Sequence, residues 1–123
     1  MRALQFGDVL NIRLPSQSPQ GHEQEGLRPA IVVGLPERAG KTRFPVVFVV
    51  PVTSDRGQDW ANAAPLLYPR FSAGSGGLRS ASIRLLDQLR CVDVRRIVDF
   101  RGSLSKEACD GLRGAFQQIL DFD

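Results

Sequence analysis

The sequence predicts a small, mainly β domain of the α+β class, in which short antiparallel strands form a strongly bent sheet or barrel followed by a C-terminal helix. Short apolar or alternating runs recur along most of the chain, separated by Pro, Gly and polar residues. After residue 103 the apolar residues take helical spacing instead. The 123 residues, 42% of them hydrophobic, can bury one core, so a single domain over 1–123 is expected.

The first half of the chain predicts three strands. In 10–14, apolar side chains alternate with Asn11 and Arg13, which is the period of a half-buried strand that stops at Pro15. Residues 16–27 are polar and aperiodic, so we expect a long loop before a second strand over 29–35. The most apolar stretch, 44–52, is predicted to be the central strand, leaving through a polar turn at 53–57.

The second half predicts shorter elements. We expect strands at 65–68, at 80–85 and from 92 toward 100, with the glycine-rich segment 72–77 as a flexible connection. Ser103 or Ser105 can cap the final helix. Its predicted buried face consists of Ala108, Leu112, Ala115, Phe116, Ile119 and Leu120. Gly111 and Gly114 weaken this helix, so packing on the sheet must hold it.

Composition narrows the functional classes. The net charge of +3 and the many arginines between residues 79 and 101 mildly favour a polyanionic partner such as nucleic acid, although a solvated basic face has the same signature. No secretory signal or membrane-spanning run is recognisable, so a cytoplasmic protein with no membrane partner is expected. Cys91 and Cys109 lack metal-ligand spacing and are expected to be small core residues, with no metal and no cofactor.

Arg28 stands where the polar loop meets the second strand, within the segment GHEQEGLRPAIVVG at 21–34. A guanidinium at such a junction has a rigid base and a solvated approach, which are what a phosphate ligand needs. From the residues alone, a surface ion pair with Glu23 or Glu25 is the favoured interpretation of this position. Thr53 has a similar alternative, because a threonine there can simply end a strand. Trp60 can stack on a base, but packing beneath a loop is the favoured interpretation.

Four segments together resemble the MazF/PemK family of toxin endoribonucleases: GDV at 7–9, GHEQEGLRP at 21–29, PVTS at 51–54 and LLDQLR at 85–90. The resemblance extends over about 7–120. It implies an SH3-like barrel, similar to CcdB, that works as a homodimer. It also implies metal-independent, sequence-specific cleavage of single-stranded RNA. The implied partner is a cognate, MazE-like antitoxin whose acidic, disordered C-terminal segment blocks the RNA groove.

The resemblance also implies roles for individual residues. The family's catalytic arginine and threonine fall on Arg28 and Thr53, and the glutamate of the loop motif falls on Glu23. The implied RNA-binding positions are His22, Gln24, Gly26, Leu27, Ser54, Ser82, Asp87, Gln88 and Arg90. The sequence departs from the family at His22, where a serine is common, and at the SAGSGG connection, so the RNA sequence preference stays open.

The chemistry of this residue set can be worked out independently. Cleavage through the 2′-hydroxyl of RNA requires a base, stabilisation of the phosphorane and a proton for the departing 5′-oxygen, and it leaves a 2′,3′-cyclic phosphate. The fork of Arg28 can stabilise the phosphorane and the hydroxyl of Thr53 can add a hydrogen bond. A guanidinium is a poor acid, so we expect a modest enzyme that depends on positioning. Glu23 is the first candidate for the base and His22 the second.

Two other functions remain compatible with the sequence. A CcdB-like toxin would poison DNA gyrase by contact and would not need the Arg28 and Thr53 pair. A non-catalytic nucleic-acid-binding barrel would retain RNA without cutting it, with an affinity that falls steeply with salt.

Overall fold

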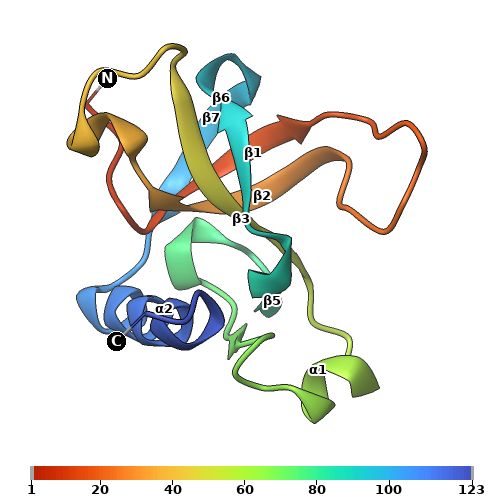
Figure 1. Ribbon diagram of the computed structural model, residues 1–123. Coiled ribbons are helices and arrows are strands. Elements are labelled where there is room, and N and C mark those ends of the chain that lie inside the picture. Colours follow the sequence, from red (N-terminus) through yellow and green to blue (C-terminus); the bar gives the residue numbers. More distant parts are fainter. Residues whose placement is uncertain (1, 123) are drawn as a thin grey trace.

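The computed structural model describes residues 2–122, in which seven antiparallel strands form one bent sheet with the order β4-β5-β3-β2-β1-β7, while β6 pairs with β3 off this path (Figure 1). The strands are β1 (Asp8–Leu14), β2 (Gly26–Gly34), β3 (Val46–Ser54), β4 (Arg70–Phe71), β5 (Ser82–Arg84), β6 (Arg90–Asp93) and β7 (Ile97–Ser103). The helices are α1 (Asp59–Ala63) and α2 (Lys106–Ile119), and the 3₁₀ turns are η1 (Pro36–Ala39), η2 (Ser75–Gly77), η3 (Leu86–Gln88) and η4 (Val94–Arg96). The predicted fold class is confirmed. The sheet is open rather than a closed barrel, because its strand order ends at β4 on one side and at β7 on the other.

β3 is the central strand, as its apolar sequence predicts. Its first half pairs with β6, its last three residues pair with β5, and β2 runs along its other edge. The strand also continues beyond its predicted end: Thr53 lies opposite Ile83 and Ser54 opposite Ser82. The predicted turn at 53–57 therefore begins only after residue 54. As a result Thr53 is held by a sheet rather than by a loop.

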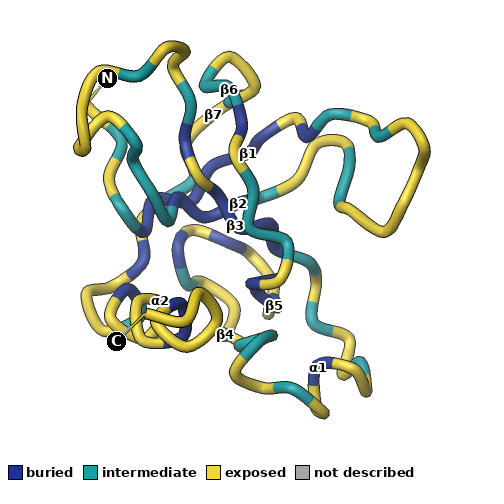
Figure 2. The backbone as a smooth tube through the Cα atoms, in the orientation of Figure 1, coloured by how far each residue is buried: buried dark blue, intermediate teal, exposed yellow. Residues whose placement is uncertain are grey.

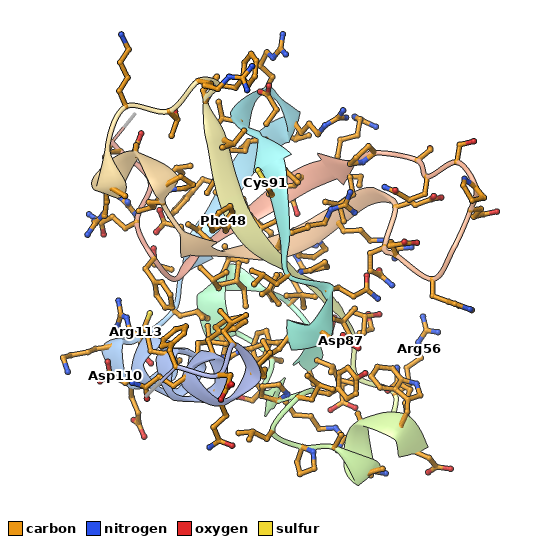
Figure 3. All side chains as sticks on the ribbon, viewed as in Figure 1. Phe48, Arg56, Asp87, Cys91, Asp110 and Arg113 are labelled. Atoms are coloured by element: carbon orange, nitrogen blue, oxygen red, sulfur yellow. The ribbon has the colours of Figure 1, made fainter. Side chains whose placement is uncertain are left out.

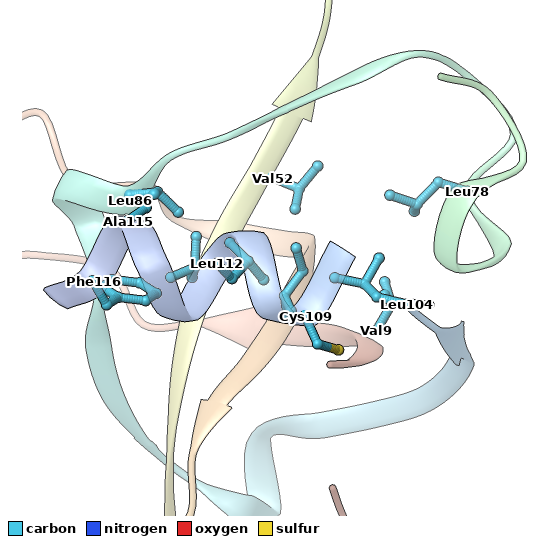
Figure 4. Packing of buried hydrophobic residues seen from close by; sticks show 11 residues of the cluster. Val9, Val52, Leu78, Leu86, Leu104, Cys109, Leu112, Ala115 and Phe116 are labelled. Atoms are coloured by element: carbon cyan, nitrogen blue, oxygen red, sulfur yellow. The ribbon is translucent and has the colours of Figure 1, made fainter. Parts of the chain in front are cut away.

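Both faces of the sheet are covered. Val9 packs toward α2 with Val50 and Val52, whereas the next residue, Leu10, packs on the opposite face, as strand alternation requires. Figure 4 shows α2 contributing Leu112 and Phe116 to the first cluster. Neither helix within residues 2–122 has the length and apolar character needed to cross a bilayer.

α2 begins as its sequence predicts. Ser105 is the N-cap, and its Oγ accepts a hydrogen bond from the Ala108 amide over 3.1 Å. Of the predicted face, Leu112, Ala115 and Phe116 are buried. Ile119 and Leu120 remain exposed. Cys109 joins the buried face.

Two predicted strands are wrong. Residues 65–68 form turns that follow α1, where the amide of Leu67 donates to the carbonyl of Ala64. The stretch from 92 toward 100 is two strands rather than one. Asp93 separates them, because its carboxylate accepts from the Arg95 amide over 2.8 Å and caps the turn η4.

Only the end of the glycine-rich segment 72–77 packs against the sheet: residues 75–77 form η2, whereas residues 72–74 are exposed. Gly76 is buried, and a Cβ added there would collide with Val9. Gly77 has a φ of +79°, and a Cβ there would collide with the carbonyl of Arg101 on β7. The glycines let η2 approach β7 closely. The expectation for Cys91 is also wrong, because its place on β6 leaves it exposed.

Candidate functional site

Two clefts meet at Thr53, near the end of β3. The smaller one, of about 280 Å³, lies between the beginning of β2 and the segment 78–82. The larger one, of about 520 Å³, lies between the β1–β2 loop, α1 and η3. Thr53 lines both. Figure 2 shows that the β1–β2 loop beside them is mostly exposed.

The smaller cleft is strongly basic, and we call it the arginine basin. Four guanidinium-bearing side chains line it, and none of the described residues that line it is acidic. Three serines and Thr53 add hydroxyl groups. The full lining is Leu27, Arg28, Pro29, Val52, Thr53, Ser54, Arg56, Leu78, Arg79, Ser80, Ser82 and Arg101. Convergent guanidinium and hydroxyl groups of this kind suit a phosphate group.

Arg28 is fixed by its own strand and loop. On β2 it lies opposite Ile12 of β1, and its Nε donates to the carbonyl of Glu25 over 3.0 Å. The ion pair that the sequence allowed does not form, because Arg28 has no salt bridge among the described residues. The Glu25 carboxylate instead accepts from the Gln17 amide over 2.7 Å. The Nη groups of Arg28 therefore have no protein acceptor within residues 2–122.

Arg101 reaches the basin from β7, two strands away from β2 in the sheet. Its Nη2 donates to the carbonyl of Gly77 over 3.3 Å. Its Nε is buried and has no hydrogen-bond partner in the described part of the chain. A guanidinium held in this way is favourable only if an anion or water completes its hydrogen bonds.

The larger cleft, which we call the aromatic pocket, is lined by His22, Gln24, Thr53, Trp60, Tyr68, Leu85, Asp87 and Gln88. Trp60 and Tyr68 stack edge to face with their ring centroids 4.9 Å apart. The Tyr68 hydroxyl donates to the Asp87 carboxylate over 2.6 Å, and this hydrogen bond raises the pKa of Tyr68. Trp60 is 45% exposed, so the expectation that it packs beneath a loop is wrong.

The β1–β2 loop is held in place over the aromatic pocket. The Gln88 side chain accepts from the Gln24 amide over 2.8 Å and donates to the His22 carbonyl over 3.2 Å. Arg90 donates to the carbonyl of Gln24 over 3.1 Å. Gln88 and Arg90, both expected to contact RNA, therefore use these groups to position the loop.

One family model matches the chain over residues 5–120, and it describes the PemK-like, MazF-like toxin of type II toxin-antitoxin systems. The chain belongs to this family. None of the curated proteins compared with it matches. The resemblance of the sequence to PemK/MazF-like toxins is thus confirmed over nearly the whole chain.

Solved structures show the same fold. MazF from Deinococcus radiodurans has a TM-score of 0.73 at 21% identity, covering 99% of this chain and 100% of that one. The MazE-MazF structure from the same organism gives 0.69 at 23% identity, with both chains fully covered. An endoribonuclease from a mycobacterial species, in complex with its cognate antitoxin, gives 0.67 at 16% identity, covering 100% of this chain and 98% of that chain.

The site residues expected for a PemK/MazF-like toxin fall into three groups. The arginine basin contains Arg28, Thr53, Leu27, Ser54 and Ser82, and the aromatic pocket contains His22, Gln24, Asp87, Gln88 and again Thr53. Glu23, Gly26 and Arg90 line neither cleft. The Glu23 carboxylate lies against Gly21, and Gly26 supplies a φ of +81° where β2 begins.

Sequence reasoning gave no individual role to Arg56, Arg79, Arg101 and Tyr68 and favoured a packing role for Trp60, although all five line these clefts. The arginine-rich stretch 79–101 signalled a basic surface without showing that its two ends meet Arg28. Arg56 lies two residues after the end of β3, and Figure 3 shows it on the same side of the molecule as Asp87. Within residues 2–122, no group of three or more His, Cys, Asp and Glu side chains is arranged to hold a metal ion.

Proposed function

We propose that this toxin is an endoribonuclease that cleaves single-stranded RNA without a metal, with the scissile phosphate in the arginine basin beside Arg28 and Thr53. The observation that carries the proposal is the position of Thr53, which borders both a basic cleft suited to phosphate and an aromatic cleft suited to a base. The arrangement accommodates one nucleotide with its phosphate on one side of Thr53 and its base on the other.

Arg28 and Thr53 supply the stabilising groups of the reaction. The free Nη groups of Arg28 bind the nonbridging oxygens as the 2′-oxygen attacks phosphorus. The Thr53 hydroxyl donates to the same developing charge and, as part of β3, does so from a fixed position. The 5′-oxygen departs with the electron pair of its bond to phosphorus and takes a proton from solvent water, since a guanidinium is a poor acid, and the products are a 2′,3′-cyclic phosphate and a 5′-hydroxyl.

The base that accepts the 2′-hydroxyl proton comes from the β1–β2 loop. Glu23 and His22 are adjacent candidates there, and His22 lines the same pocket as Thr53. Glu23 must turn away from Gly21 to reach a substrate. Glu23→Gln and His22→Gln separate the two: the substitution of the base lowers the maximal rate by about 10²-fold or more, and the other one affects mainly the affinity.

The aromatic pocket gives the enzyme its sequence preference. A splayed base stacks on Trp60 or Tyr68, while the Asp87 carboxylate accepts from an amino or imino group on the base edge. In this proposal Gln24 and Ser54 contact the adjoining nucleotide. Leu27 and Ser82 form part of the wall of the arginine basin, and Gly26 acts through the turn at the start of β2.

The test is cleavage of a fluorescent single-stranded RNA in EDTA by the purified full chain. We expect Arg28→Ala and Thr53→Val each to lower the cleavage rate by about 10²-fold or more, with an unchanged circular dichroism spectrum. Arg113→Ala is the matched control, because Arg113 is an exposed arginine on α2 that lines neither cleft. RNA left intact by the wild-type protein would overturn the proposal.

Two outcomes would instead favour the other functions. Growth inhibition that survives both substitutions would favour a CcdB-like toxin that acts by contact. Retention of uncleaved RNA, with an affinity that falls steeply with salt, would favour a non-catalytic binding module.

The proposed partners follow from the same surface. A homodimer that exposes a basic groove would attract an acidic, disordered segment of a MazE-like antitoxin that folds as it binds. In the cytoplasm, RNA cleavage would stop translation and growth. Expression of this chain alone should inhibit growth, and co-expression of the small neighbouring reading frame should relieve it. Toxicity that no neighbouring reading frame relieves would argue against an antitoxin.

A further inference from the structure

A third cleft, of about 400 Å³, lies on α2 and shares no lining residue with the arginine basin or the aromatic pocket. We call it the helix-end pocket. One wall is Pro65, Leu66 and Pro69, and the other is the first half of α2. Arg84 of β5 is the only basic residue among the described residues that line it. Figure 1 shows β5 between α2 and α1, beneath the main part of the sheet.

Arg84 is buried without a partner. Its side chain is 7% exposed, its Nε has no hydrogen-bond acceptor, and it forms no salt bridge within residues 2–122. Its Cζ lies 4.2 Å from the centroid of the Phe71 ring, which supports one face of the guanidinium. Burial lowers the pKa of Arg84. A buried, unpaired guanidinium is unfavourable unless an anion or water completes it.

The beginning of α2 adds a second positive element at the same place. Ser105, Glu107 and Ala108 line the pocket, and α2 is a 14-residue helix. The Ser105 cap satisfies the amide of Ala108, while the amides of Lys106 and Glu107 have no partner inside the helix. These amides and the helix dipole favour a negative charge beside Arg84.

We propose that the helix-end pocket binds a carboxylate group attached to an apolar body, with the fork of Arg84 paired to the carboxylate oxygens. A planar carboxylate matches a single guanidinium in two parallel hydrogen bonds. A doubly charged phosphate fits less well, because Glu107 borders the same pocket and the walls are largely apolar. The proline and leucine side chains would contact the aliphatic part of the ligand. This inference is independent of RNA cleavage.

The carboxylate can come from a free aliphatic acid or from a Glu or Asp side chain of a partner protein. Glu107 itself is the competing explanation, since it borders the pocket without bonding to Arg84 in the structure. The experiment therefore has to detect Arg84 directly and to distinguish these three sources.

Titration of the ¹⁵N-labelled full chain, followed at the arginine Nε–H signals, meets both requirements. We expect sodium butyrate at constant ionic strength to shift the Arg84 signal and the Lys106 and Glu107 amides saturably, while sodium chloride does not. A capped Leu-Glu-Leu peptide that saturates at concentrations tenfold lower, with Leu-Gln-Leu inactive, identifies a protein side chain as the source. Butyrate binding alone identifies a free acid.

Gly111→Leu and Gly114→Leu form a matched pair. Both glycines lie on α2 with open space where a Cβ would be, but only Gly111 lines the helix-end pocket. We expect Gly111→Leu to weaken butyrate binding at least tenfold and Gly114→Leu to leave it unchanged. The proposal is overturned if no probe gives a saturable shift, if both variants bind equally well, or if Glu107→Gln shifts the Arg84 signal in the direction opposite to butyrate, which would show that Glu107 already pairs with Arg84.

Discussion

Gln88 holds Gln24 by a hydrogen bond of 2.8 Å between the Gln24 amide and the Gln88 side-chain oxygen, across 64 positions of sequence. The same side chain donates to the His22 carbonyl. Because both bonds go to the backbone of the β1–β2 loop, η3 fixes the loop whatever its side chains bind. The aromatic pocket therefore has a preformed wall.

Loss of this contact should release the loop. Gln88→Met preserves the length of the side chain but removes both hydrogen bonds, which contribute about 1–3 kcal/mol together. We expect faster hydrogen exchange over residues 20–25, RNA cleavage reduced by about tenfold or more, and a free energy of unfolding lowered by no more than that amount. Gln118→Met, on an exposed position of α2, is the control. Unchanged exchange in the loop would show that other contacts hold it.

The arginine basin predicts a measurable salt dependence. Arg56→Ala, Arg79→Ala and Arg101→Ala should each weaken binding of a noncleavable 2′-deoxy oligonucleotide. Each should also reduce the slope of log affinity against log salt by about 0.7, the value for one phosphate contact in a single strand. Arg95→Ala is the control, since Arg95 pairs with Asp93 in a turn outside the basin. Equal slopes in all four variants would exclude a phosphate path through the basin.

Asp8 predicts a loss of stability in acid. Its carboxylate, 1% exposed, receives hydrogen bonds from Arg2, Ser103 and the Gln5 amide. Burial by itself would raise the pKa of Asp8, but these hydrogen bonds outweigh it and the pKa is lowered. The unfolded carboxyl has a pKa of about 3.9. The stabilisation is therefore complete well above pH 4 and is lost as the pH falls through the lower folded pKa.

Thermal unfolding from pH 7 to pH 3 tests this. Asp8→Asn should lower the free energy of unfolding by about 1–3 kcal/mol at neutral pH and should flatten its decline in acid. Asp110→Asn, at an exposed pair on α2, should change neither. If the free energy of unfolding of the wild-type protein does not decrease as the pH is lowered from 4 to 3, the role of Asp8 is contradicted.

The two cysteines should differ in reactivity. Burial raises the pKa of the Cys109 thiol, whereas Cys91 is exposed on β6. Because the thiolate is the reactive form, we expect a thiol reagent to label Cys91 rapidly and Cys109 only after unfolding. Mass spectrometry of the intact protein should show one adduct under native conditions, and none in Cys91→Ser. Two adducts at equal rates would mean that α2 opens readily.

The sequence predicts those parts of the fold that depend on local pattern. The apolar run that becomes β3 and the helical spacing capped by Ser105 both signal their elements without any neighbour. α1 is five residues long, too short for a periodic pattern, so it was missed. Cys91 faces outward because β6 pairs opposite Phe48 in one particular register, which no local pattern encodes.

The site divides in the same way. Arg28 and Thr53 could be singled out because each belongs to a recognisable segment, and both line the arginine basin. Arg101 could not be placed beside them. Its position depends on the pairing of β7 with β1 and of β1 with β2, and then on η2 approaching β7. These are long-range contacts, and the arginine-rich composition only suggested their result.

The close contact between η2 and β7 has a consequence for tolerance to mutation. An added methyl group would meet the Arg101 carbonyl at Gly77, the Gly76 backbone at Gly102, and Val9 of β1 at Gly76, and the strain would displace the strand that carries Arg101. In a mutational scan scored by toxicity, we therefore expect substitutions at these three glycines to abolish toxicity as often as substitutions of the arginines in the arginine basin. These glycines contribute no functional group to the site. They would be selected because any side chain there would clash with a neighbouring segment.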